Sequence, residues 1–278
     1  MSVRISKGLA RDARPTSTTA ELGEAARTDS PLLHLESISR HFGKLKAVNE
    51  VSFEMAAGEL RAVIGPNGAG KTTFFNLITG LHAPTSGRVW FEGRDITRLP
   101  AVERVSLGIV RTFQITEIFP DLSVFENIRL GVETAANVNA RPFVSRTTRA
   151  ALDHRVRELI EIVDLGDKRA NLVGELAHGD QRVVEVAIAL SLRPRLLLLD
   201  EPTAGMGDAE TASMVTLMQR LHDEQGVSIL FVEHDMDIVF GIAQRITVLD
   251  QGRVLAEGRP DEISANPKVR AAYLGEMT

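Results

Sequence analysis

The first third of the chain alternates between short apolar runs and turn residues, a pattern typical of β-strands. A helix is expected to follow Gly70, over Thr72–Leu81, because this stretch contains no proline. A second, short helix is expected within residues 98–110. The expected strands are Leu32–Ile38, Val51–Met55, Leu60–Ile64 and Arg88–Glu92.

The middle of the chain, roughly residues 120–190, has a helical pattern. In Leu152–Val163 the apolar side chains recur at i, i+4, i+7, i+8 and i+11, which places them on one face of a helix. Residues 181–192 predict a second, more buried helix. It ends before Arg193-Pro194, because a proline ring cannot continue a helix.

The last third alternates again between strands and helices. This alternation predicts an α/β fold in which a mostly parallel sheet is covered on both faces. The sequence Asp250-Gln251-Gly252 predicts a hairpin turn. The expected strands are Arg195–Leu199, Val227–Val232, Arg245–Leu249 and Arg253–Glu257, and the expected helices are Ala209–Gln225 and Met236–Ala243.

Composition narrows the class of protein. Of 278 residues, 44% are apolar and 25% are charged, which excludes disorder throughout the chain. No apolar run approaches the length of about 18 residues that a membrane-spanning helix needs. A net charge of −5 gives no sign of a nucleic-acid-binding face, and the absence of cysteine excludes thiol chemistry.

The first 30 residues differ from the rest, because they are rich in Ala, Arg, Ser and Thr and contain few large apolar side chains. We expect a disordered tail here. Four early cations and few acids are also compatible with a transit peptide, whereas the apolar core of a signal peptide is not visible.

The most specific motif is a glycine-rich run between an apolar strand and the first expected helix. Its glycines allow successive N–H groups to face phosphates, and the helix adds its positive end. Lys71 is expected to reach the β- and γ-phosphates, and Thr72 to offer a hydroxyl to Mg²⁺. Kinases, GTPases and motor ATPases all use such a loop. The run is Gly65, Pro66, Asn67, Gly68, Ala69, Gly70, Lys71, Thr72 and Thr73, which fits G-x-x-x-x-G-K-[ST].

Two acids end a continuous apolar strand, at the position where ligands bind in an open α/β sheet. We expect Asp200 to hold Mg²⁺, through water, because this ion keeps part of its hydration shell. Glu201 points elsewhere and is expected to orient an attacking water or accept its proton.

Taken together, these residues resemble those of an ABC transporter ATP-binding subunit, from about Leu32 to Gly275. The resemblance implies an ABC-type P-loop NTPase fold with an N-terminal antiparallel β portion and a helical subdomain. It also implies roles for three further residues. Gln114 would touch Mg²⁺ and the attacking water, His234 would contact the γ-phosphate, and Phe42 would stack on adenine.

The signature segment departs from the family pattern L-S-G-G-Q. Here Ala177, His178 and Gly179 follow Leu176, so the serine hydroxyl that bonds the γ-phosphate is missing. Backbone N–H groups and the helix N-terminus remain available to the phosphate. We expect a working but altered site, with a degenerate, inactive site as the alternative. The aspartate of the following loop is also displaced, because its position falls on Gly207 and Asp208 comes one residue later.

The resemblance further implies partners and a place in the cell. Two ATPase subunits, identical or sisters, would pack head to tail with ATP between Lys71 of one and Gly179 of the other. Integral membrane permease subunits and, indirectly, a substrate-binding protein would complete the assembly at the cytoplasmic face of the membrane, with no nucleic acid. The expected division is a tail over 1–30 and an ATPase domain over 31–278. That domain includes a helical subdomain over about 115–190 and a C-terminal extension over about 258–278.

Subfamily features favour ATPases of branched-chain amino acid importers. They include Arg111-Thr112-Phe113-Gln114, Glu233-His234-Asp235-Met236 and Ala271-Ala272-Tyr273-Leu274-Gly275. Importers of urea or short amides share most of them, and an exporter remains open. A soluble ABC-type ATPase acting on ribosomes or DNA usually has two cassettes or a long coiled coil. A small-molecule kinase leaves Gln114 and His234 unexplained.

Overall fold

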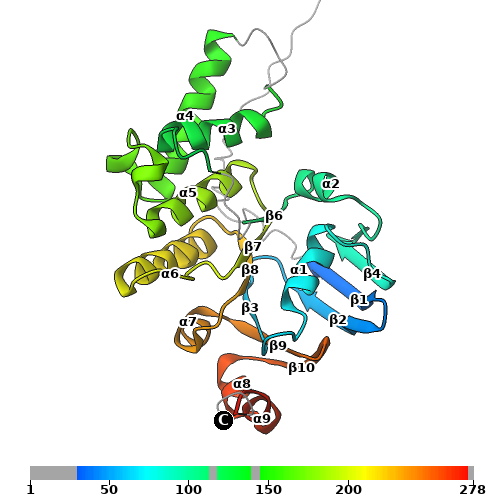
Figure 1. Ribbon diagram of the computed structural model, residues 1–278. Helices are drawn as coiled ribbons and strands as arrows, with labels where there is room; N and C mark the ends of the chain where they lie inside the picture. Colours follow the sequence, from blue (N-terminus) through cyan, green and yellow to red (C-terminus); the bar gives the residue numbers. More distant parts are fainter. Residues whose placement is uncertain (1–29, 113–117, 139–144, 275–278) are drawn as a thin grey trace, which may run out of the picture.

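The computed structural model of the protein describes residues 30–112, 118–138 and 145–274. It contains two sheets and a separate group of helices (Figure 1). The antiparallel sheet lies beside helix α1, and the helical group extends beyond the edge of the second sheet that carries β6 and β7. This arrangement confirms the predicted α/β class.

The first sheet has the order β2-β1-β4-β5 and is antiparallel. Its two long strands extend well beyond the predicted runs, because they continue as a hairpin to Phe42 and Leu45. Bulges near Ser37 and Glu50, both with positive φ, interrupt the alternation of apolar residues. The sequence pattern therefore showed only half of each strand. The strands are β1 (Leu33–Phe42), β2 (Leu45–Met55), β4 (Ser86–Phe91) and β5 (Arg94–Asp95).

The second sheet has the order β10-β9-β3-β8-β7-β6, and all neighbours are parallel except β10 and β9. The short strand β6 was not predicted, because three residues are too few to show a period. It follows α2, the short helix expected within residues 98–110. The strands are β3 (Leu60–Ile64), β6 (Ile109–Arg111), β7 (Leu196–Asp200), β8 (Ser228–Val232), β9 (Arg245–Asp250) and β10 (Arg253–Gly258).

Alternate residues of the central strands enter two different hydrophobic cores. On β7, Leu197 and Leu199 belong to the core that includes the helical group, whereas Leu196 and Leu198 face the core shared with the antiparallel sheet. A strand that is buried on both faces has no polar side, because successive side chains point in opposite directions. The continuous leucine run of β7 is thus explained.

Helices cover the second sheet and form the separate group. The group consists of α3, α4 and α5, which contact one another. Helix α4 begins six residues before the predicted apolar face, where Ser145 caps it. The helices are α1 (Lys71–Thr79), α2 (Ala101–Ser106), α3 (Val124–Ala135), α4 (Arg146–Ile162), α5 (His178–Ser191), α6 (Asp208–Asp223), α7 (Met236–Ile242), α8 (Pro260–Ala265) and α9 (Pro267–Leu274).

A buried arginine on α2 caps the C-terminal end of α1. Arg104 donates hydrogen bonds to the carbonyl oxygens of Leu77 (2.7 Å) and Ile78 (2.8 Å), in the last turn of α1. These carbonyls have no partner within the helix, so a cation here is favourable. Burial lowers the pKa of Arg104 to about 10, and the side chain remains charged at neutral pH.

None of the helices within the described residues is both long and apolar enough to cross a bilayer.

Candidate functional site

The glycine-rich loop joins β3 to α1 in a conformation that requires glycine at two positions. Gly65 has φ 155°, and a Cβ there would lie 2.2 Å from the backbone oxygen of Leu249. Gly70 has φ 103°, and its Cβ would lie 2.3 Å from the backbone oxygen of Ala47. Neither obstacle is a flexible side chain. The loop is therefore held between two backbone segments, with its N–H groups at the start of α1.

Lys71 begins α1 and turns back across the loop. Its side chain is largely buried, and its Nζ donates to the carbonyl oxygens of Gly65 (2.5 Å) and Pro66 (3.2 Å). The ammonium group is thus kept within the loop. A cation at the N-terminus of a helix is the combination that binds phosphate anions.

Glu201 and His234 approach the same loop from the ends of β7 and β8. Their nearest atoms, Oε1 of Glu201 and Nε2 of His234, form a hydrogen bond of 2.9 Å. Glu201 has φ 50°, an uncommon backbone conformation that functional sites tolerate. Both side chains line one cavity of about 500 Å³ together with the loop. The lining residues are Leu45, Lys46, Ala47, Asn67, Gly68, Ala69, Gly70, Lys71, Thr72, Thr73, Glu201, His234 and Gln251.

A buried carboxylate beside His234 holds two loops together. Oε1 of Glu233 accepts from the backbone N–H (2.9 Å) and the hydroxyl (2.6 Å) of Thr203. Its Oε2 accepts from the backbone N–H of His234 (3.1 Å). Glu233 was not predicted as a functional residue, although it was quoted in a subfamily motif. Its partner Thr203, 30 residues away, is visible only in the fold.

Asp200 is not one of the described residues that line the cavity. Its carboxylate is buried at the end of β7 and forms an ion pair with the guanidinium of Arg111. Together with the Thr72 hydroxyl it supplies oxygen donors, which Mg²⁺ prefers. The described residues hold no group of three or more His, Cys, Asp or Glu suited to a metal.

The predicted adenine platform stands apart from this cavity. Phe42 is not among the residues that line it; the residue is 41% exposed, and its ring packs edge-on against His82 with ring centres 5.5 Å apart. The guanidinium of Arg40 lies 4.7 Å from the Phe42 ring centre. Gln114 lies outside the described residues. The proposed roles of both residues stay predictions.

The signature segment starts α5, and the cavity lining does not include it. Ala177 precedes the helix and makes no side-chain cap, and His178 is its first residue. The N–H of Gly179 donates to Oε1 of Glu210 (3.3 Å), whose Oε2 accepts from the N–H of Gly207 (3.2 Å). Glu210 was also missed, since only the packing of α6 against α5 brings it there.

The chain resembles known proteins along most of its length. The sequence pattern of the ABC transporter family matches residues 48–204. BraF of Pseudomonas aeruginosa, a high-affinity branched-chain amino acid transport ATP-binding protein, is 38% identical over 252 residues, which cover 88% of this chain and 98% of BraF. LivG of Salmonella typhimurium, described in the same words, is 40% identical with the same coverage. The chain belongs to the ABC transporter family.

Solved structures of ABC transporter cassettes share its fold. A nucleotide-free ATP-binding cassette superposes with a TM-score of 0.76 at 29% identity, over 87% of this chain and 98% of that one. The dimeric bacterial ABC transporter cassette MJ0796 superposes with a TM-score of 0.69 at 26% identity, over 82% and 98%. The protein is therefore an ATP-hydrolysing cassette of a transporter.

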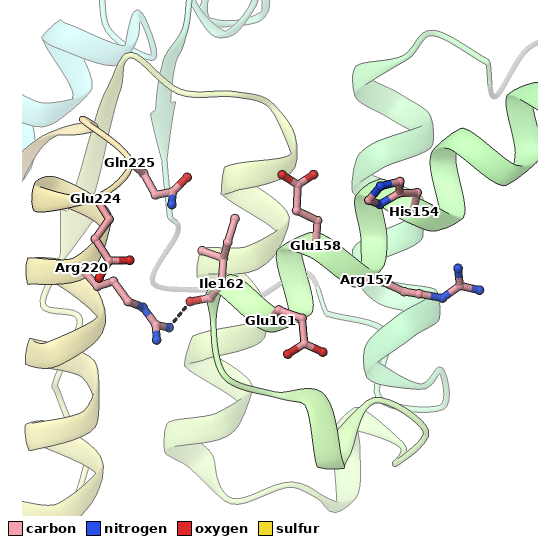
Figure 2. A pocket seen from close by; sticks show the side chains of 8 residues that line it. All are labelled: His154, Arg157, Glu158, Glu161, Ile162, Arg220, Glu224 and Gln225. Atoms are coloured by element: carbon pink, nitrogen blue, oxygen red, sulfur yellow. Dashed lines mark hydrogen bonds between the residues drawn. The ribbon is translucent and has the colours of Figure 1, made fainter.

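This ABC cassette has a second cavity, of about 760 Å³, between α4 and α6 (Figure 2). Arg220 donates to the carbonyl oxygen of Ile162 across it, and Arg157 extends away from α6. The residues around it carry both signs of charge, and none of them belongs to the motifs that identify the family. They are His154, Arg157, Glu158, Glu161, Ile162, Arg220, Glu224 and Gln225.

Proposed function

We propose that this ABC cassette powers an importer of branched-chain amino acids. The observation that carries the substrate class is the naming of BraF and LivG as branched-chain amino acid transport ATP-binding proteins. The sequence pattern of the branched-chain amino acid ATP-binding cassette transporters also matches residues 253–277. That segment lies outside the region matched by the general family pattern, so it is a second, separate likeness.

The cavity at the loop suits hydrolysis of the bond between the β- and γ-phosphates of ATP. Lys71 neutralises charge on the γ-phosphate, and the N–H groups at the start of α1 hold the phosphate oxygens. Glu201 orients a water and accepts its proton, while His234 fixes the carboxylate of Glu201. Thr72 and Asp200 would hold Mg²⁺, which would offset the negative charge of the phosphates.

A second ATPase subunit completes the site in this proposal. The signature residues Ala177, His178 and Gly179 are not part of the cavity of their own chain. Solved cassettes of the same fold form dimers. An identical or a sister subunit would therefore supply the α5 N-terminus to the γ-phosphate.

Membrane partners follow from the same proposal. The transporter-subunit names of the relatives support permease subunits as partners and the cytoplasmic face of the membrane as the place of action. We place the permease contact near Gln114 and the helical subdomain over about 115–190, with a substrate-binding protein as the indirect partner. The tail over 1–30 and the C-terminal extension over about 258–278 complete the proposed division of the chain.

The proposal is tested by capturing the assembly and then reconstituting it. The tagged Glu201→Gln chain, which should hydrolyse slowly and hold the closed dimer, is captured from membranes with ATP present. The permease proteins recovered with it are reconstituted in vesicles with wild-type chain and the binding protein. We expect ATP-dependent uptake of labelled leucine, isoleucine or valine, and no uptake with the Lys71→Ala chain.

Two other outcomes change the proposal in different ways. Uptake of urea without uptake of leucine moves the same ATPase to a urea or short-amide importer. Recovery of ribosomal or DNA-bound proteins alone overturns the transport role and leaves the ATPase site intact.

A further inference from the structure

The proposed metal ligand Asp200 already has a cation beside it. Nη2 of Arg111 donates to Oδ2 of Asp200, and both side chains are almost fully buried, with 7% and 4% of their surface exposed. Arg111 ends β6 and Asp200 ends the neighbouring parallel strand β7. Arg111 belongs to the motif Arg111-Thr112-Phe113-Gln114, in which only Gln114 was predicted to have a role.

The guanidinium of Arg111 also contacts the helix that follows the phosphate loop. Its Nη1 donates to Oδ1 of Asn76 on α1 (2.6 Å), and its central carbon lies 5.6 Å from the ring centre of Phe75. The planar fork of the side chain therefore bridges a charged acceptor and a neutral one. If the bond to Asp200 is released, the bond to Asn76 and the ring contact still hold the guanidinium in place.

The charge of Asp200 requires a partner in this position. A buried carboxylate without a cation is strongly unfavourable, because burial removes its hydration. Arg111 meets this requirement in the structure. A bound divalent cation would meet it too, and it would use the same carboxylate, directly or through water. One buried carboxylate cannot satisfy both cations fully, so the two interactions oppose each other.

We infer that Arg111 is the counter-ion of Asp200 within the chain and that it must release this carboxylate for the chain to bind a divalent cation. Arg111 is then a positioning residue, which orients Asp200 at the end of β7 and competes with the cation for its carboxylate. The inference rests on the proposed role of Asp200 in holding Mg²⁺.

If the pair of Arg111 and Asp200 had only a structural role, removing the arginine would not tighten metal binding. The chain offers a control for this possibility, because it contains a second buried arginine that is paired with an acid. Arg61 on β3 is equally buried, lies 3.0 Å from Oε1 of Glu59 and stacks over the Phe53 ring at 4.6 Å. It bonds the backbone of Glu54 and is not part of the phosphate-loop cavity. Its removal tests the loss of a buried arginine as such.

The experiment measures Mn²⁺ binding by electron paramagnetic resonance, with a non-hydrolysable ATP analogue present. Arg111→Met should bind Mn²⁺ roughly five- to tenfold more tightly than wild type, because the competing cation is gone. Arg111→Lys keeps the charge and should stay within about twofold of wild type. Arg61→Met should match wild type. Thermal unfolding should show a larger Mn²⁺-induced rise in Tm for Arg111→Met than for Arg61→Met.

Unchanged or weaker Mn²⁺ binding in Arg111→Met overturns the inference. If that variant does not fold, Asn76→Leu provides the test. Without its neutral acceptor, the guanidinium should stay on Asp200 and weaken Mn²⁺ binding roughly two- to threefold, and unchanged binding overturns the inference.

Asp200→Asn separates this inference from the proposed metal site. If Asp200→Asn weakens Mn²⁺ binding while Arg111→Met leaves it unchanged, only the role of Arg111 fails. If Asp200→Asn binds Mn²⁺ as wild type does, the metal assignment of Asp200 fails and the inference fails with it.

Discussion

Helices α1 and α5 both begin at a segment that the family resemblance assigns to ATP phosphates, yet their N-termini carry opposite charges. At α1 the ammonium group of Lys71 lies within the loop, bonded to the Gly65 and Pro66 carbonyls. At α5 the preceding Ala177 makes no side-chain cap, and the carboxylate of Glu210 accepts from the N–H of Gly179.

The two helix N-termini of the proposed site therefore differ in how readily each can accept a phosphate. The α1 end carries a cation and a loop held by backbone contacts, so it suits an anion without rearrangement. At the α5 end an N–H group is already bonded to an anion of the same chain. A phosphate that arrives there must displace Glu210. We expect the α1 end to bind nucleotide in a single chain and the α5 end to act only on dimerisation.

The largest effect is expected from removing the cation at the N-terminus of α1. Lys71→Ala should lower the rate of phosphate release at least about a hundredfold, because the charge on the transferred group loses its fixed partner. The exposed Lys268→Ala serves as the control and should hydrolyse ATP as wild type does. Near-normal hydrolysis by Lys71→Ala contradicts the assignment of the phosphate loop.

Glycine-to-alanine changes at both ends test their rigidity. In Gly70→Ala the new Cβ meets the backbone of Ala47 at a positive φ, which should cost about 3 kcal/mol or more and abolish nucleotide binding. In Gly179→Ala the new Cβ meets three atoms of the Glu210 side chain, including its Cβ at 2.9 Å, so α6 must shift slightly. That variant should lose about 1–2 kcal/mol and still bind nucleotide. Denaturant unfolding and calorimetric titration measure both effects. Equal losses would show that the ends are equally rigid.

Removing the charge at the α5 end should help dimerisation. Glu210→Gln keeps one acceptor oxygen, enough for the N–H of Gly179 or of Gly207 but not for both, and it no longer repels an incoming phosphate. In the Glu201→Gln background, the ATP concentration for half-dimerisation should fall by about two- to fivefold. Light scattering across an ATP titration measures it, with Asp208→Asn on the same helix as the control. A rise in that concentration would mean that Glu210 assists the α5 end.

Another test restores the family hydroxyl. Ala177→Ser places a good N-cap residue before α5, which should raise the free energy of unfolding by about 1 kcal/mol. ATP hydrolysis should stay unchanged or rise by about tenfold, which corresponds to the lower end of the range for one hydrogen bond to a charged group. Steady-state hydrolysis and urea unfolding report the two effects. A large loss of hydrolysis argues against placing this segment at the nucleotide of a second subunit.

The local sequence pattern was sufficient to predict those site residues that come directly after a single strand. The predicted strand Leu60–Ile64 has the observed bounds of β3, and the phosphate loop follows it as expected. Glu201 was selected because it follows an apolar strand, and His234 was selected from the family resemblance. They meet in one cavity because the carboxyl ends of parallel strands lie at the same edge of a sheet.

Contacts between residues that are distant in the chain could not be predicted from such a pattern. Arg111 and Asp200 are separated by 89 positions and Gly179 and Glu210 by 31, and each contact depends on which strands or helices become neighbours. The long hairpin of β1 and β2 was shortened in prediction for a related reason. Its bulges change the alternation where the partner strand, not the local sequence, determines the register.

Local pattern and motif order establish which chemical groups this cassette has: a glycine loop with Lys71, two acids after a leucine strand, and a histidine after the next strand. The electrostatic partners of the buried groups come from the fold alone. Packing placed Arg111 on Asp200, Glu233 on Thr203, and Glu210 on the N–H of Gly179. Propensity and periodicity act over a few residues, whereas the neutralisation of a buried charge depends on which groups packing brings within hydrogen-bond distance.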